Sequence, residues 1–331
     1  MVNRPNDIVA VGSAIVDHLV MVDHRTLAST GLEPGTMTLI DAEEADRLHR
    51  AVSGRLVAGG SAANTAVGVS ALGGGAVFVG RVGADDMGRV FTEDLRAAGV
   101  AFASPPTEER IGTGRCLVLV TPDGERTMRT YLGAAPLLGI DCVDEATVGG
   151  ARYLYLEGYL WDSEHAMVAV DRALEVARRS GTRVALSLSD PGCVERHHDA
   201  LRGLLEDGGV DVLFANQAEV LTLVGAASID EAALAVSKWC DVAALTLGPA
   251  GSVVVGPEAR VEVAAEPVEA VVDTTGAGDQ YAAGFLVGLC RGWGLERCAR
   301  LASVAAADVI EAVGARPSDR LGARLTAAGL T

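Results

Sequence analysis

Short apolar segments alternate with longer amphipathic segments through the second half of the chain, and this alternation constrains the fold most. Five apolar runs fit strands: Arg152–Leu156, Val184–Leu188, Val212–Ala215, Ala243–Thr246 and Ser252–Val255. Segments of helical periodicity separate most of them: Glu164–Ser180, Asp199–Leu205, Ala218–Val224 and Asp230–Cys240. Because strand–helix–strand units cross over in one hand, the pattern predicts an α/β fold with a mostly parallel sheet and helices on both faces.

The first half of the chain continues this pattern and adds a small β excursion. Strands are predicted at Ile8–Gly12 and Ala76–Gly80, around a helix of small residues at Ala62–Leu72. Residues 18–41 alternate apolar and polar side chains, which favours exposed strands, and residues 110–132 contain a hairpin signature. Further helices are predicted at Glu43–Ser53, Met87–Ala98, Gly278–Arg291 and Cys298–Val313. Since no repeat or linker interrupts the sequence, we expect one domain over residues 1–331.

Composition excludes several classes of function. The chain has 27 basic and 44 acidic residues, a net charge of −17, which argues against nucleic-acid and membrane partners. Lys238 is the only lysine, so the lysine-dependent phosphate sites of P-loop proteins and protein kinases are excluded. Six scattered cysteines without a C-x-x-C pair argue against zinc and favour a reducing, cytoplasmic location. The N-terminus lacks the form of a signal peptide, and the uncharged stretch Leu56–Gly80 is too rich in glycine for a membrane helix.

Ligands of open parallel sheets bind beyond the carboxyl ends of the strands, so the segments that follow strands are the candidate site. These segments are Asp17, Gly59–Asn64, Asn216–Glu219, Thr246–Gly251 and Asp273–Asp279. In the last one, small residues open an apolar helix, which leaves backbone N–H groups converging at the positive end of the helix dipole. The pattern predicts an anion hole built without lysine. A carboxylate in the first turn, Asp279, suits accepting a proton from a hydroxyl that attacks a phosphoryl group.

Four ordered motifs resemble those of the ribokinase-like (PfkB) carbohydrate and nucleoside kinases. They are GGSAANTA at 59–66, NQAE at 216–219, TLGPAG at 246–251 and DTTGAGD at 273–279. The resemblance extends from about Asp7 to Pro317. It implies a three-layer sandwich around a mostly parallel sheet, with a small β-sheet lid formed by about 18–41 and 110–132. It also implies a kinase that uses ATP and Mg²⁺ to phosphorylate a hydroxyl group of a small molecule.

The resemblance also implies a role for individual residues. Asp279 matches the catalytic base, and Gly276, Ala277 and Gly278 match the anion hole. The residues that match contacts to the acceptor substrate are Asp17, Gly59, Gly60, Ser61 and Asn64. The residues that match contacts to ATP are Asn216, Thr246, Gly248, Gly251 and Gly278. Asn216 and Glu219 match the pair that organises Mg²⁺ through water, and Asp273 and Thr275 match a potassium-binding loop.

The same residues have plainer interpretations. The N-x-x-E spacing of Asn216 and Glu219 is that of a helix capping box, and Thr246–Gly251 fits a tight turn between strands. Asp17 fits a turn residue at a strand end. Arg126 lies where adenosine kinases carry an arginine that reaches the phosphates, and it also fits a solvated hairpin charge.

Several segments are most similar to those of adenosine kinases, including GGSAAN in place of GGKGAN and residues 152–161. Leu160 and Gly192 stand where those enzymes place aromatic rings around the purine, and Tyr159 and Trp161 are the candidates to replace them. We therefore expect adenosine or a related nucleoside as the substrate. A sugar kinase of the ribokinase or fructokinase type and a non-catalytic nucleoside-binding protein are the alternatives. Lid strands in this family often pair between subunits, which would give a homodimer.

A phosphorylated sugar is a further alternative within the sugar-kinase hypothesis. It would require basic residues near Asp17, for which Arg115 and Arg129 on the predicted lid strands are the candidates.

Overall fold

A computed structural model describes residues 6–257 and 259–331. Its larger sheet is built from β1 (Asn6–Val11), β5 (Ala76–Val79), β6 (Ala101–Phe102), β9 (Ala151–Glu157), β10 (Arg183–Ser187), β11 (Val212–Asn216), β12 (Val242–Thr246), β13 (Ser252–Val255) and β14 (Arg260–Val263). Their order is β14-β13-β12-β11-β10-β9-β1-β5-β6. Neighbours from β6 to β12 pair in parallel, whereas β13 and β14 pair antiparallel at one edge. The predicted mostly parallel sheet is therefore confirmed.

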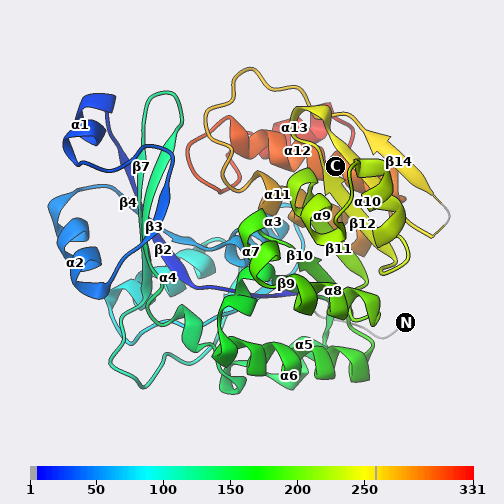
Figure 1. Cartoon of the computed structure of the whole chain (residues 1–331), viewed down its shortest axis with the longest axis horizontal. Coiled ribbons are helices and arrows are strands. Elements are labelled where there is room, and N and C mark those ends of the chain that lie inside the picture. Colours follow the sequence, from blue (N-terminus) through cyan, green and yellow to red (C-terminus); the bar gives the residue numbers. More distant parts are fainter. Residues whose placement is uncertain (1–5, 258) are drawn as a thin grey trace.

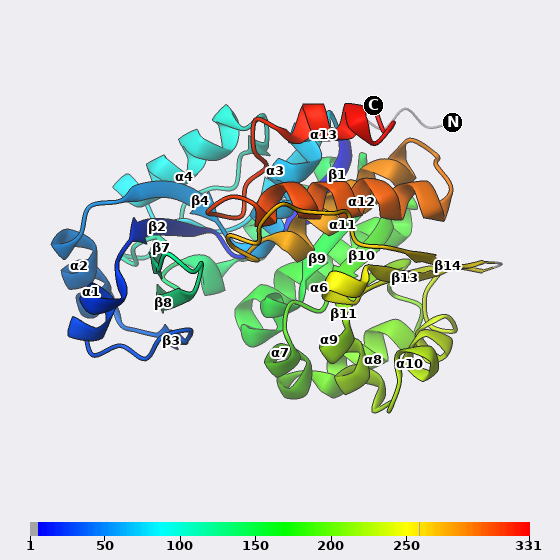
Figure 2. The ribbon, with the colours of Figure 1, turned by 90° about the horizontal axis from the view of Figure 1, so that it is seen from above.

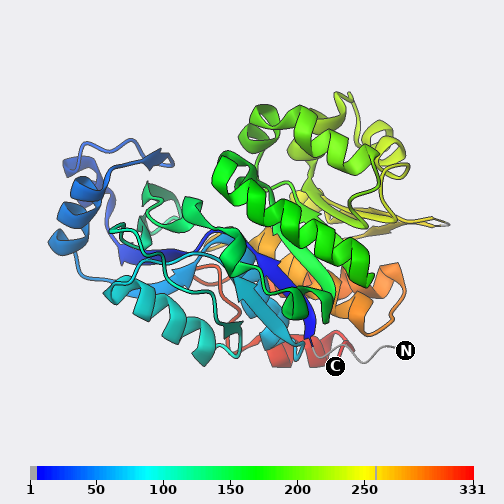
Figure 3. The same ribbon diagram turned by 90° about the horizontal axis from the view of Figure 1, so that it is seen from below.

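Helices cover both faces of this sheet, which gives three layers (Figure 2). One face carries α3 (Ser61–Ala71), α4 (Asp86–Ala97), α11 (Ala277–Cys290), α12 (Leu295–Ile310) and α13 (Leu321–Ala327). The other carries α5 (Glu145–Gly149), α6 (Glu164–Ser180), α7 (Pro191–Arg196), α8 (His198–Glu206), α9 (Gln217–Val224) and α10 (Ile229–Val236), seen from below in Figure 3. Alternate side chains of β9 serve the two layers: Tyr153 and Tyr155 pack in the first, Leu154 and Leu156 in the second.

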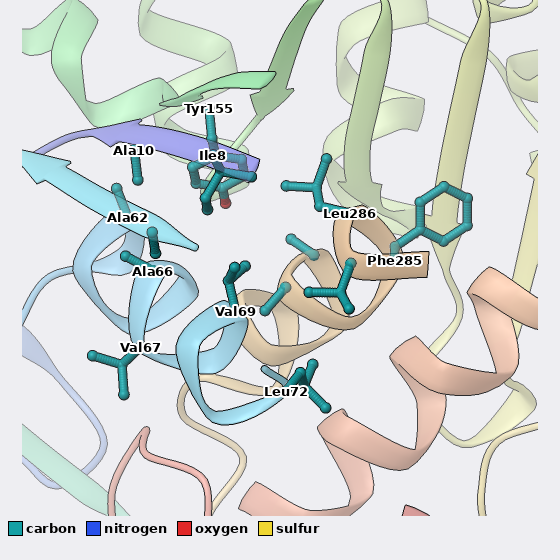
Figure 4. Packing of buried hydrophobic residues seen from close by; sticks show 14 of the residues in the cluster. Ile8, Ala10, Ala62, Ala66, Val67, Val69, Leu72, Tyr155, Phe285 and Leu286 are labelled. Carbon is teal, nitrogen blue, oxygen red and sulfur yellow. The ribbon is translucent and has the colours of Figure 1, made fainter. Parts of the chain in front are cut away.

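Close packing of α3 against α11 brings two motifs together. Ala62, Ala66 and Val69 of α3 and Phe285 and Leu286 of α11 belong to one buried cluster against the larger sheet (Figure 4). A Cβ atom at Gly68 would lie 2.2 Å from Gln280 Oε1 and 2.7 Å from Ala283 Cβ, so only glycine permits this approach. The N-terminal ends of both helices, which carry the GGSAAN and DTTGAGD motifs, are thereby fixed relative to each other.

A second, five-stranded sheet projects from one side of the body (Figure 1). It contains β2 (Ile15–Met21), β3 (Met37–Leu39), β4 (Arg55–Gly59), β7 (Gly114–Val120) and β8 (Arg126–Tyr131), in the order β3-β8-β7-β2-β4. The β7–β8 hairpin is antiparallel, as predicted. The strand β4 was not predicted, since its residues merge with the uncharged GGSAAN segment that follows.

The prediction of exposed strands over residues 18–41 is only partly right. The helix α1 (His24–Ser29) interrupts the segment because Asp23 caps it, its side chain accepting from Thr26 N at 2.6 Å. Together with α2 (Ala42–Ala51), α1 covers the outer face of the small sheet, where Val20, Leu117 and Leu119 are buried. The opposite, inner face carries Asp17 and turns toward the larger sheet. Among the described residues, no helix is long and apolar enough to span a bilayer.

Candidate active site

The start of α11 has the shape of an anion-binding site. Gly276 adopts φ +78°, and a Cβ atom there would lie 2.5 Å from Ala315 Cβ, so the turn into the helix requires glycine. Within the described chain, the amides of Gly278 and Asp279 donate to no protein acceptor, and the space beside Gly278 is open. The predicted anion hole therefore has free donors at the positive end of a buried helix. We expected the segment before α11 to follow a parallel strand directly. In the structure it follows a loop that comes after the antiparallel strand β14.

Asp279 is held by the first turns of α3. Ser61 Oγ donates to Asp279 Oδ1 at 2.7 Å, and Asn64 Nδ2 donates to Oδ2 at 3.1 Å. Burial raises the pKa of Asp279 to about 6, although both hydrogen bonds oppose this shift. The carboxylate is thus oriented, ionised above about pH 6 and able to accept a proton. Ser61 and Asn64, which we expected at the sugar, contact this carboxylate directly.

Asp17 faces a small, partly open cavity, which we call the acceptor cavity. The cavity is lined by Asp17, Leu19, Arg55, Val57, Asn64, Arg126, Val313, Gly314, Ala315 and Arg316. Asp17 lies inside the strand β2 and not in a turn at a strand end. Burial raises the pKa of Asp17 to about 6, while Arg126 and Arg316 lower it. The cavity therefore offers a carboxylate that accepts hydrogen bonds from ligand hydroxyls.

The glycines of the GGSAAN motif make room for these groups. A Cβ atom at Gly59 would lie 2.3 Å from Asp17 Oδ2, and one at Gly60 would lie 2.1 Å from Ser13 O. Gly60 also has φ +98° and precedes the first residue of α3. Both positions are restricted to glycine by the packing of β2 against the start of α3.

Three charged residues of the site were not predicted: Arg55, which lines the cavity, Arg316 and Glu157. Arg316 donates to Ala58 O and to Asp94 Oδ2, and its charge lies close enough to Asp17 and Asp279 to lower the pKa of both. Glu157 is fully buried at the end of β9 and accepts from Ser13 N at 2.7 Å and from Ala62 N at 2.8 Å.

Burial raises the pKa of Glu157 to about 7. Its two hydrogen bonds tie the β1–β2 junction to the start of α3. The sequence gives one indication of this role, because Glu157 is a charged residue at the end of an otherwise largely apolar strand.

The NQAE motif forms the capping box of α9. Asn216 Oδ1 accepts from Glu219 N at 2.9 Å, and Glu219 Oε2 accepts from Asn216 N at 2.8 Å. Burial raises the pKa of Glu219 to about 7. In the described part of the chain, no group of three or more His, Cys, Asp or Glu side chains could hold a metal. Because both oxygens of Glu219 already accept from Asn216, the pair fits contact with Mg²⁺ through water and not direct coordination.

The TLGPAG motif is a tight turn between β12 and β13. Gly251 has φ +92°, and a Cβ atom there would lie 2.0 Å from Val263 O, whereas Gly248 has open space beside it. Asn216 pairs with Thr246 across the parallel strands β11 and β12. The NQAE and TLGPAG motifs therefore lie at the same edge of the sheet, which we call the nucleotide edge.

Arg126 and Asp273 contact each other, which the sequence did not predict. Arg126 forms a buried ion pair with Asp273, so its guanidinium is engaged and does not extend as a free arm toward phosphates. Asp273 also accepts from Thr275 N at 3.0 Å and from Gly314 N at 2.8 Å. A carboxylate whose oxygens are filled by two amides and a guanidinium does not fit direct potassium ligation. Potassium binding at Asp273 and Thr275 stays a prediction.

The expected aromatic and basic replacements are also absent from the acceptor cavity. Tyr159 is 37% exposed on a 3-10 turn (Gly158–Asp162) next to Asp190, and Trp161 packs in the core on the α6 face. Neither ring lines the cavity. Arg115 pairs with Asp46, and Arg129 donates to Thr38, both away from Asp17. The arginines that do line the cavity are Arg55, Arg126 and Arg316.

A helix start with free amides, a buried carboxylate beside it and a cavity lined by a second carboxylate suit one class of enzyme, phosphotransferases that act on an alcohol group. The family model described as pfkB family carbohydrate kinase matches residues 25–320. The chain belongs to this family.

Individual relatives agree with this assignment. Adenosine kinase of Saccharomyces cerevisiae is 30% identical over 341 residues, which cover 95% of this chain and 98% of the relative. The crystal structure of adenosine kinase from Sinorhizobium meliloti is 42% identical, with a TM-score of 0.89 over 98% of this chain and 99% of the other. A probable sugar kinase from Rhizobium etli is 39% identical, with a TM-score of 0.91 over 99% and 100% of the two chains.

Proposed function

We propose that this chain is an ATP- and Mg²⁺-dependent kinase that phosphorylates the 5′-type primary hydroxyl of adenosine or a related nucleoside. The observation that carries the proposal is Asp279, held by Ser61 and Asn64 beside the free amides of α11 and next to the acceptor cavity. The similarity to the adenosine kinases of S. cerevisiae and S. meliloti supports the choice of acceptor.

In this mechanism the acceptor sugar binds against Asp17. Its carboxylate accepts hydrogen bonds from ring hydroxyls, while Asn64 lines the same cavity and Gly60 sets the turn into α3. Asp279 then takes the proton of the attacking hydroxyl, for which a pKa of about 6 is well placed.

The transferred phosphoryl group is stabilised by the amides of Gly278 and Asp279 and by the dipole of α11. Gly276 and Ala277 set the turn that aims these amides. Mg²⁺, contacted through water by Asn216 and Glu219, would neutralise charge on the phosphate oxygens. Thr246, Gly248 and Gly251 would border the nucleotide at the same edge of the sheet.

We further propose that the small sheet closes over the acceptor cavity as a lid and excludes water. The lid then comprises β4 in addition to the two segments predicted from the sequence, and the chain acts as one unit in the cytoplasm. Pairing of lid strands between subunits, which would give a homodimer, stays a prediction; it would use an edge strand of the small sheet, β3 or β4.

A sugar kinase is the second candidate, and a specific observation favours it. No aromatic ring of the described chain lines the acceptor cavity, whose apolar side chains are Leu19, Val57 and Val313, with Ala315. Arg55 and Arg316, which also line the cavity, would suit a phosphorylated sugar. The similarity to the probable sugar kinase of R. etli is consistent with this candidate.

An acceptor panel separates the candidates. ATP consumption with Mg²⁺ would be measured for adenosine, inosine, guanosine, cytidine, ribose, ribose 1-phosphate and fructose, with Asp279→Asn as the control. We expect the highest kcat/KM for adenosine. Turnover on a sugar alone would keep the mechanism and overturn the acceptor. Binding of adenosine without turnover on any acceptor would favour a binding protein.

A further inference from the structure

The tip of the β7–β8 hairpin makes direct contact with the loop that leads into the anion hole. Gly124, in the hairpin turn, has φ +82°, and a Cβ atom there would lie 1.8 Å from Val272 O. Two residues further on, Arg126 pairs with Asp273, and the two side chains are only 8% and 1% exposed. The small sheet and the anion-hole loop are thus joined by a backbone contact and a buried ion pair.

Asp273 connects this contact to the anion hole. Its carboxylate accepts from Gly314 N at 2.8 Å and from Thr275 N at 3.0 Å. Ala315, next in the chain, packs against Gly276, the residue that sets the turn into α11. The carboxylate of Asp273 therefore holds both backbone segments that shape the anion hole, the one at Thr275 and the one at Gly314.

A buried carboxylate without a counter-charge is strongly destabilising, so Asp273 needs a cation beside it. In this structure the cation is the guanidinium of Arg126, contributed by the small sheet. We propose that Arg126 is a positioning residue that takes the place of a monovalent metal ion at Asp273, so that the anion hole is held in shape only when the small sheet is closed. Its link to catalysis rests on the proposed kinase function.

Two consequences distinguish this role from a structural ion pair. The wild-type enzyme has no vacancy for potassium at Asp273, so its activity does not depend on potassium. Without the guanidinium, the buried carboxylate of Asp273 has no counter-charge. A small cation from solution can then supply the positive charge that Arg126 supplied.

The activity test compares wild type, Arg126→Ala and Arg126→Lys in potassium chloride, in guanidinium chloride at low concentration and in N-methylglucamine chloride at equal ionic strength. We expect equal wild-type rates with potassium and N-methylglucamine. Arg126→Ala should lose at least about tenfold in kcat and recover part of it with guanidinium or potassium, while Arg126→Lys retains more activity. The exposed Arg89→Ala variant, whose arginine pairs only with Asp86 and Glu93, should show no cation response.

A thermal unfolding series in the same salts needs no substrate. The wild-type midpoint should not rise with potassium relative to N-methylglucamine, and the midpoint of Arg126→Ala should fall and then rise with potassium or guanidinium. A potassium-dependent wild-type rate or midpoint would overturn the proposal, as would an Arg126→Ala enzyme that is fully active without added cation. If Arg126→Ala does not fold, the wild-type and Arg126→Lys measurements decide. If no acceptor is phosphorylated, the kinase proposal fails while the unfolding series still tests the cation.

Discussion

The acceptor cavity and the nucleotide edge are built in opposite ways. At the nucleotide edge, Asn216 and Glu219 satisfy each other within one helix turn, and the glycine turn closes between adjacent strands. At the acceptor cavity, Asp279 depends on Asn64, a partner 215 residues away in the sequence, and Asp17 faces arginines from two other segments. The carboxylates at the acceptor cavity are thus held by elements far apart in the sequence. The nucleotide edge is held by contacts between residues close in the sequence.

This difference predicts where substitutions act. A substitution of Asp17 or Asp279 should lower activity and leave folding intact. Burial raises the pKa of both carboxyl groups, so their charged forms do not stabilise the fold. A change at the nucleotide edge should affect local stability and Mg²⁺ use together. The following experiments, from the largest expected effect to the smallest, can break or sharpen this contrast.

Asp279→Asn should have the largest effect. The amide keeps the size of the side chain and can still accept from Ser61, but it cannot take a proton, so kcat should fall about 10³-fold. Steady-state kinetics measures the loss, and an unchanged thermal midpoint shows that the fold persists. A variant that retained most of its activity would remove Asp279 from the role of base.

Asp17→Asn should weaken binding of the acceptor substrate and leave binding of ATP unchanged. Losing a charged acceptor of hydroxyl hydrogen bonds costs about 2–3 kcal/mol, which corresponds to a decrease of about 100-fold in kcat/KM for the acceptor. The KM for ATP should change little. Equal losses for both substrates would mean that Asp17 shapes the whole site and does not bind the acceptor in particular.

Glu219→Gln should change both the Mg²⁺ requirement and the stability of the protein. We expect the Mg²⁺ concentration for half-maximal activity to rise about tenfold, since a neutral amide attracts hydrated Mg²⁺ weakly. The capping box should weaken by less than about 1 kcal/mol, measured by urea unfolding, because glutamine can still accept from Asn216 N but without a charge. An unaltered Mg²⁺ requirement with reduced stability would leave Glu219 as a cap only.

The two regions should also titrate separately. The pKa values of Asp17 and Asp279 are raised to about 6, and both groups act as carboxylates, so kcat/KM for the acceptor should rise with pH through about 6. The pKa of Glu219 is raised to about 7, so the requirement for Mg²⁺ should ease as pH rises through about 7. A pH profile at saturating and at limiting Mg²⁺ checks both. A single midpoint for both quantities would contradict the separation.

Local features of the site could be predicted from the sequence and distant ones could not. The capping box of α9, the glycine turn and the helix start of α11 follow from residues within a few positions of each other. Seven of the nine strands of the larger sheet were predicted within two residues, because both faces are buried and the apolar runs are continuous. The short edge strands β6 and β14 were not predicted, since neither forms a continuous apolar run.

Glu157 and Arg316 were missed, since their partners lie about 95 residues or more away and no spacing encodes them. The pairing of Arg126 with Asp273, across 147 residues, could not be predicted for the same reason. The helix α1 was missed because a short segment capped by one aspartate resembles an alternating strand. Residues whose role depends on burial therefore required the structure.

The most direct test of the central claim is product analysis after incubating the protein with ATP, Mg²⁺ and adenosine, for wild type and Asp279→Asn in parallel. We predict that the wild-type protein forms ADP and adenosine 5′-phosphate in equal amounts, and that Asp279→Asn forms almost none of either. Wild-type protein that consumes ATP without forming a phosphorylated nucleoside, or an Asp279→Asn variant that forms it at the wild-type rate, would contradict the account.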